Sequence, residues 1–211
     1  MMHTDGTNVN RKVAQGASTR AALLVAGRKL FGAQGFSDTS MDDIASAAGV
    51  TKGALYHHFS SKDAVFRAVY EQVKREITDQ VAPSFMEREP WAALVAGCQA
   101  TLDAHLDPEV RRIVMFDGRA VLGWEIVREV ESRYGAIVLR GALRKAMHAG
   151  VIERQPLVPL AQMLNGALTE ACMLIADAAP DETGAARAQI GALVVRILDG
   201  LRARNAAEPR A

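Results

Sequence analysis

The chain has 211 residues, of which 49% are hydrophobic and 23% are charged, and this composition excludes a disordered protein. The formal net charge is +1, but residues 1–62 carry seven Lys and Arg against four Asp and Glu, so positive charge is concentrated in the N-terminal part. We see no apolar leader with a cleavage site and no stretch near the roughly 18 apolar residues of a membrane span. We therefore expect a cytoplasmic protein without membrane contact, in which the two cysteines are buried thiols.

The N-terminal part begins with a polar segment and continues as a helix. Residues 1–17 are polar and lack periodicity, so we expect a flexible arm there. From Ser18 onward apolar residues recur at spacings of three and four, and the pattern closes at Gly32 and Gly35. This spacing predicts a first helix.

Two short helices follow in the sequence. Ser40 and Asp43 have the spacing of a capping box and open a second helix, which reaches a turn residue at Gly49. Thr51 is placed to cap a third helix. Ser60 and the residue three positions later repeat the capping-box spacing and predict a long fourth helix.

The rest of the chain is a series of amphipathic segments. The fourth helix should end near Pro83, and the run Asp107-Pro108-Glu109 has the cap, proline and acid typical of a helix start. Further helices are predicted at residues 91–106, 122–149, 157–178 and 185–203. No strand-like run competes with them, so the predicted fold class is all-α.

The second and third helices have the arrangement of a helix-turn-helix, whose second helix enters the major groove of DNA. The segment GVTKGALYHHF places Lys52 and Gly53 at the start of that helix, where free backbone N–H groups attract anions. Gly53 lacks the Cβ that would keep a phosphate or base edge away. Tyr56, two histidines and Lys62 add donors for phosphate oxygens, so this segment predicts a DNA-binding surface.

The run MDDIASAAGVTKGALYHHFSSKDAVF, with the helix before it, closely resembles the DNA-binding domain of TetR-type (tetracycline-repressor-like) bacterial transcription regulators over about residues 18–66. The resemblance implies a helix-turn-helix domain at residues 18–62, a helical effector-binding and dimerisation domain at residues 63–205, and a tail at residues 206–211. It also implies operator contacts from Thr39, Ser40, Thr51, Lys52, Gly53, Tyr56, His57, His58 and Lys62.

Metal binding and catalysis are weaker interpretations of the polar residues. His57 and His58 are neighbours in a helix, so their side chains diverge by about 100° and do not chelate one ion as residues four apart do. Asp107 is explained as a helix cap, and no nucleophile stands in a recognisable frame. We expect no metal, no cofactor and no enzymatic activity, while Tyr56 as a simple core ring stays open.

Soft, bulky and polar residues in the middle helices are candidates for an effector cavity. For any single bulky residue a core position is the better interpretation, and for the polar residues a solvated face is at least as good an interpretation as ligand contact. Together they predict a site for a small apolar or aromatic effector, lined by Met86, Trp91, Cys98, His105, Arg112, Met115, Phe116, Asp117, Arg119 and Trp124.

The last two predicted helices each carry an apolar stripe, which suits a four-helix bundle formed with a second copy of the chain. The expected homodimer interface contains Leu164, Leu168, Ile190, Leu193, Val194, Ile197 and Leu201. We interpret the chain as a dimeric repressor that binds a palindromic double-stranded DNA operator and is released by its effector. A ligand-independent DNA-organising protein and an enzyme with an accessory helix-turn-helix remain alternatives.

Overall fold

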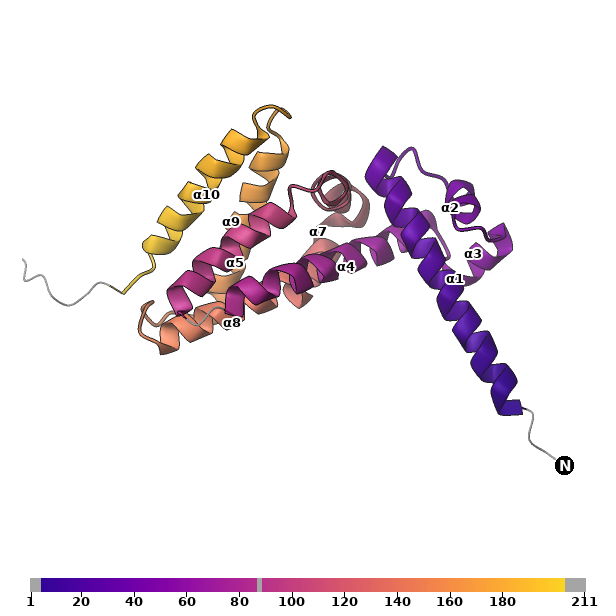
Figure 1. The fold of residues 1–211 in the computed structure, drawn as a ribbon, viewed down its shortest axis with the longest axis horizontal. Helices are drawn as coiled ribbons and strands as arrows, with labels where there is room; N and C mark the ends of the chain where they lie inside the picture. Colours follow the sequence, from indigo (N-terminus) through magenta and orange to yellow (C-terminus); the bar gives the residue numbers. More distant parts are fainter. Residues whose placement is uncertain (1–4, 87–88, 204–211) are drawn as a thin grey trace, which may run out of the picture.

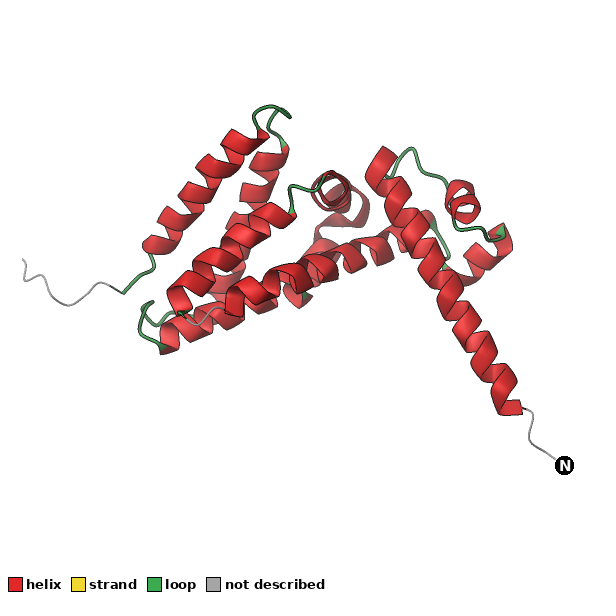
Figure 2. Cartoon of the chain, viewed as in Figure 1, coloured by secondary structure: helices red, strands yellow, loops and turns green. Residues whose placement is uncertain are grey.

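The structure is a computed structural model that describes residues 5–86 and 89–203. Within these ranges all regular structure is helical, apart from one isolated β-bridge between Ile152 and Arg202 (Figure 2). The predicted all-α class is therefore confirmed. The predicted C-terminal tail at residues 206–211 lies outside the described residues, as do the first four residues of the predicted arm.

The N-terminal module consists of α1 (Asp5–Gln34), α2 (Met41–Ala47) and α3 (Lys52–His58). Leu23 and Phe31 of α1, Ile44 of α2 and Leu55 of α3 are fully buried and share one core. The burial of one residue every three or four positions is what the sequence spacing predicts for short amphipathic helices. This core holds α3 against the rest of the module.

The start of α1 differs from the sequence prediction. Residues 5–17 are helical, whereas the sequence predicted a flexible arm. Because the later turns of α1 are fixed by packing, each residue added before them needs only helix propagation and no new nucleus. No proline interrupts the chain before Pro83. Figure 1 shows this half of α1 extending away from the body of the molecule.

Helix α4 (Lys62–Val81) joins the N-terminal module to the larger domain (Figure 1). Its cap is Ser61, whose Oγ accepts from the backbone N of Ala64 at 3.1 Å, so the predicted capping box beginning at Ser60 is wrong by one residue. Phe66 and Tyr70 of α4 are fully buried. The helix ends at Val81, close to the predicted end, and a 3-10 turn, η1 (Ala82–Met86), follows.

The larger domain contains α5 (Pro90–Ala104), α6 (Pro108–Val110), the π-helix η2 (Arg111–Asp117), α7 (Gly118–Arg133), α8 (Gly135–His148), α9 (Leu157–Ala176) and α10 (Thr183–Asp199). The helix predicted at residues 122–149 is two helices, divided at Tyr134. Within α7, Gly123 has φ 75° and kinks the helix, a conformation that glycine adopts without steric cost.

Helix α9 lies between the other helices of this domain. By length and composition alone, α9 is the one described helix that could cross a membrane. The sequence analysis had found no stretch of that kind. It packs on α8, α10 and α5, and its Leu168 and Cys172 are buried. Part of the apolar surface of α9 is thus used for packing inside the domain, whereas Met163 and Leu174 of this helix are 74% and 53% exposed.

Candidate nucleic-acid interface and effector cavities

The helix-turn-helix is built by local capping and one glycine turn. Asp43 N donates to Ser40 Oγ at 3.1 Å and Ser40 N donates to an oxygen of Asp43 at 2.9 Å, which completes the predicted capping box. Gly49 has φ 67°, the left-handed conformation that a tight helix-to-helix turn requires. Thr51 Oγ1 accepts from Ala54 N at 3.2 Å and caps α3. Each of these contacts was predicted from the sequence.

The start of α3 is an open, polar surface. Thr51, Lys52 and Gly53 are exposed, and no described atom lies within 4 Å of the position that a Cβ on Gly53 would occupy. Tyr56 is 47% exposed, so the interpretation of its ring as a core residue is wrong. With the exposed Ser40 and His57, these residues form what we call the α3 face.

Two side chains carry opposite charges at the α3 face. Lys52 Nζ lies 2.8 Å from an oxygen of Asp42, and the hydrogen bond to that carboxylate raises the pKa of Lys52. Both side chains are exposed, so the pair is weak and its ammonium is free to exchange partners. A broad hollow of about 480 Å³ lies beside them, and Tyr56 and Lys62 also line it.

Thr39 and Lys62 have structural contacts that the sequence did not predict. Thr39 is buried, and its Oγ1 donates to the carbonyl of Gly35 at 2.8 Å, so it is not part of the α3 face. Lys62 Nζ donates to the carbonyl of Phe36 at 2.8 Å and lies 4.2 Å from the centre of the Phe36 ring. Its ammonium therefore holds the loop between α1 and α2. His58 is half-buried beside His57, with ring centroids 5.3 Å apart.

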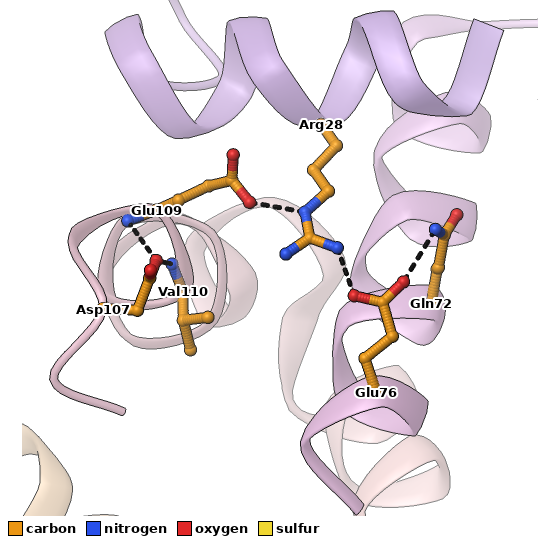
Figure 3. A network of polar contacts seen from close by, with 6 residues as sticks. All are labelled: Arg28, Gln72, Glu76, Asp107, Glu109 and Val110. Carbon is orange, nitrogen blue, oxygen red and sulfur yellow. Dashed lines mark hydrogen bonds and ion pairs between the residues drawn. The ribbon is translucent and has the colours of Figure 1, made fainter. Parts of the chain in front are cut away.

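An ionic junction connects α1 to the larger domain (Figure 3). Arg28 of α1 binds Glu76 of α4 through one nitrogen and Glu109 of α6 through another. Glu109 is held in turn because Asp107 accepts from its backbone N at 2.9 Å and caps α6, as predicted. Burial lowers the pKa of Arg28, but the hydrogen bonds to the two glutamates outweigh this effect and raise it overall.

Two residues predicted to contact an effector belong to the same junction. Asp117 accepts from the backbone N of Phe36 at 2.9 Å, across the boundary between the two domains. Arg112 and Asp117 both lie 3.4 Å from the position of a Cβ on Gly35. The sequence analysis offered them as polar groups of an effector cavity, but the π-helix turns them toward the loop that follows α1.

The other predicted effector residues do not form one cavity. Cys98, His105 and Met115 are buried at separate places in the core, and burial raises the pKa of the Cys98 thiol to about 12. Met86 and Phe116 are exposed at 70% and 41%. Trp91 lies under Arg202 at 4.7 Å, whereas Arg119 and Trp124 line a common cavity.

A buried ion pair that the sequence analysis missed occupies the middle of the larger domain. Lys74 Nζ of α4 lies 2.7 Å from an oxygen of Glu131 of α7, and the side chains are 6% and 14% exposed. Burial raises the pKa of Glu131, but Lys74 and the amide of Asn165 outweigh this effect and lower it overall. The pair lines an inner cavity of about 30 Å³ together with His105. This volume suffices for water but not for a larger ligand.

A larger cavity of about 500 Å³ adjoins the ion pair. Its walls come from α7, α8 and α9, and Glu131, Asn165 and Thr169 line both cavities. A volume in the range of about 300–1,000 Å³ is typical of small-molecule sites. We call this space the outer cavity.

The predicted dimer residues divide into two groups. Leu164, Leu168 and Val194 are buried within one chain, whereas Leu193 and Ile197 on α10 are 49% and 54% exposed. Ile190 and Leu201 are half-buried. An apolar cavity of about 270 Å³ on α5, α9 and α10 adjoins the exposed pair.

These features define a class of protein: a helix-turn-helix with an exposed second helix, carried by a larger helical domain with cavities. A family model described as "Bacterial regulatory proteins, tetR family" matches residues 23–69, and one described as "Tetracyclin repressor-like, C-terminal domain" matches residues 91–201. The chain belongs to the TetR family of bacterial transcriptional regulators.

Individual relatives agree over much of the chain. A solved TetR-family transcriptional regulator from Pectobacterium atrosepticum is 34% identical, with a TM-score of 0.78, over 93% of this chain and 98% of that one. The Transposon Tn10 TetC protein of Escherichia coli is 26% identical over 75% of this chain and 81% of TetC. The transcriptional regulator SrpR of Pseudomonas putida is 33% identical over 51% of each chain, so this match spans about half of that relative.

Proposed function

We propose that the chain is a cytoplasmic repressor that binds a pseudo-palindromic operator as a homodimer and is released by a small apolar or aromatic effector. The observation that carries the DNA-binding part is the open start of α3, where a Cβ on Gly53 would meet no described atom within 4 Å outside its own helical turn. Repression as the default agrees with the repressor-like family model of residues 91–201. We assign the chain no catalytic reaction.

The proposed DNA contacts come from the α3 face. The hydroxyls of Ser40 and Thr51, the ammonium of Lys52 and the rings of Tyr56 and His57 are exposed there, and such groups donate to phosphate oxygens. On DNA, the ammonium of Lys52 leaves the carboxylate of Asp42 and binds a phosphate. Thr39 and Lys62 act in this proposal through the loop that they hold and not through the operator.

The proposed homodimer forms along α9 and α10. Leu193 and Ile197 expose apolar surface next to the apolar cavity on these helices, and a second copy would bury both. Two copies related by a twofold axis present two α3 faces to DNA. The half-sites of the operator should then lie about 34–36 Å apart, or a multiple of that distance.

Selection from random DNA at physiological salt tests the DNA-binding part. The wild-type chain should enrich a pseudo-palindrome, whereas a DNA-organising protein would enrich none. Gly53→Val should abolish enrichment, because its side chain fills the space that the DNA backbone must enter. The matched control is Gly184→Val, since Gly184 is also the second residue of its helix and a Cβ there would also meet no described atom within 4 Å outside its own helical turn. Enrichment of the same sequence by Gly53→Val would contradict the docking of α3.

A further inference from the structure

The outer cavity has an unusual charge for a site that takes purely apolar molecules. Three arginines line it: Arg119 and Arg128 of α7 and Arg140 of α8. In the part of the chain that the structure describes, none of the three forms an ion pair. Elsewhere on α7, Arg133 is paired with Glu129 at 2.6 Å, so unpaired arginines are not a general property of this helix.

Two carboxylates also line the outer cavity, but they do not balance the arginines. Glu131 is neutralised by Lys74, whose Nζ is 2.7 Å away. Among the residues that line the cavity, Glu170 is therefore the single carboxylate without a paired cation, and the arginines contribute three guanidinium groups. The outer cavity has an excess of positive charge, which favours an anionic occupant.

The remaining walls fit an aromatic ring. Trp124 is 57% exposed although it lines the cavity, and the guanidinium of Arg119 lies 5.2 Å from the centre of its ring. Val127 of α7 and Val158 and Ala161 of α9 add apolar surface. An indole face next to apolar side chains is a stacking surface for a flat molecule.

We propose that the outer cavity binds a small aromatic carboxylate. The arginine forks would hold the carboxylate by charge-assisted hydrogen bonds, and Trp124 and the valines would cover the ring. The inference deepens the proposed function, on which it rests, because it names the chemical class of the effector. The cavity also reaches Glu131, so the bound ring lies next to the ion pair that includes Lys74 of α4.

Calorimetry with two ligands of one shape tests the proposal. We use 2-naphthoate as the probe and 2-naphthamide as its neutral analogue, with the full chain. The wild-type chain should bind 2-naphthoate about tenfold or more tightly than 2-naphthamide, because charge-assisted hydrogen bonds are the stronger ones. The double substitution Arg128→Gln and Arg140→Gln should remove this preference while the affinity for the amide stays within about twofold.

Arg133→Gln is the matched control, since it removes an arginine of the same helix that does not line the outer cavity. It should leave both affinities unchanged, and circular dichroism checks that every variant is folded. Absence of 2-naphthoate binding to the wild-type chain, equal affinities for the two ligands, or a preference that survives the double substitution would each overturn the proposal.

Operator binding is measured separately in the same samples. If 2-naphthoate binds in the arginine-dependent manner but leaves operator affinity unchanged, the aromatic carboxylate site is supported and the ligand-released function fails. If the wild-type chain selects no operator while the arginine-dependent preference is present, the DNA-binding part fails and the site is again supported. The two failures are thus distinguishable.

Discussion

Replacement of Lys74 by methionine should strongly destabilise the larger domain. Lys74 and Glu131 are both largely buried, and Nζ lies 2.7 Å from the carboxylate oxygen. Lys74→Met keeps the length of the side chain but leaves a buried carboxylate without its cation. Breaking a buried pair from one side costs about 3–5 kcal/mol of unfolding free energy.

The loss of unfolding free energy caused by Lys74→Met should depend on pH. In the wild-type chain the pKa of Glu131 is lowered, so the pair contributes stability above the unfolded pKa of about 4.3, and this contribution is lost as the pH falls through the folded pKa. In Lys74→Met, burial raises the pKa of Glu131, and protonation relieves the unpaired charge. The difference between the two proteins should therefore be largest near pH 7 and smaller near pH 5.

Urea denaturation at one protein concentration measures this difference. The double variant Lys74→Met and Glu131→Leu should recover most of the loss, because apolar side chains replace a buried pair at little cost. Arg67→Met is the control: Arg67 pairs with Glu71 at 3.1 Å but is 41% exposed, and its loss should cost about 0.5 kcal/mol or less. A loss below about 1 kcal/mol for Lys74→Met would refute the reasoning and indicate a hydrated pair.

Three further predictions concern the interface, acid stability and the junction. The double variant Leu193→Asp and Ile197→Asp should be a monomer in light scattering and should bind the operator more weakly. The control Ile137→Asp, on the half-exposed face of α8, should leave the dimer intact. A dimer that persists in the double variant would place the interface elsewhere. Burial and the ammonium of Lys74 lower the pKa of His105 to about 4. The unfolding free energy should therefore fall by up to about 3 kcal/mol as the pH falls from about 6.5 to about 4. In urea denaturation, His105→Gln should flatten the dependence of stability on pH in this range. Arg28→Met should lower the unfolding free energy by about 1 kcal/mol. Because the ion pairs of Arg28 are partly exposed, the loss should be larger at 0.05 M than at 0.5 M salt. A loss that does not depend on salt would indicate that Arg28 acts through packing.

The features that the sequence predicted well depend on short stretches of chain. The capping box at Ser40, the turn at Gly49 and the cap at Thr51 each involve residues no more than four positions apart. Their geometry follows from backbone chemistry that is the same in any helical protein. The order of most helices was predictable for the same reason, although the cap of α4 lies at Ser61 and not at Ser60, and the helix predicted at residues 122–149 is divided at Tyr134.

The candidate effector residues were less predictable because they depend on helix rotation. The π-helix η2 replaces regular α-helical turns with i→i+5 hydrogen bonds, so it changes which side chains face the core after Arg111. Met115 is buried and Phe116 is exposed within this segment. Lys74 and Glu131 are far apart in the sequence, and neither residue type signals burial. Their pairing follows from tertiary packing alone.

The route from the outer cavity to the α3 face runs along one helix. Lys62 at the start of α4 holds the carbonyl of Phe36 in the loop before α2, and Lys74, twelve residues later and about 18 Å along the axis, pairs with Glu131 at the cavity. If α4 tilts as a unit, we expect a ligand that displaces Glu131 to displace also the loop that positions the DNA-binding helices. Binding at the two sites is then reciprocal: an effector that weakens operator binding by some factor must itself bind the operator complex more weakly by the same factor.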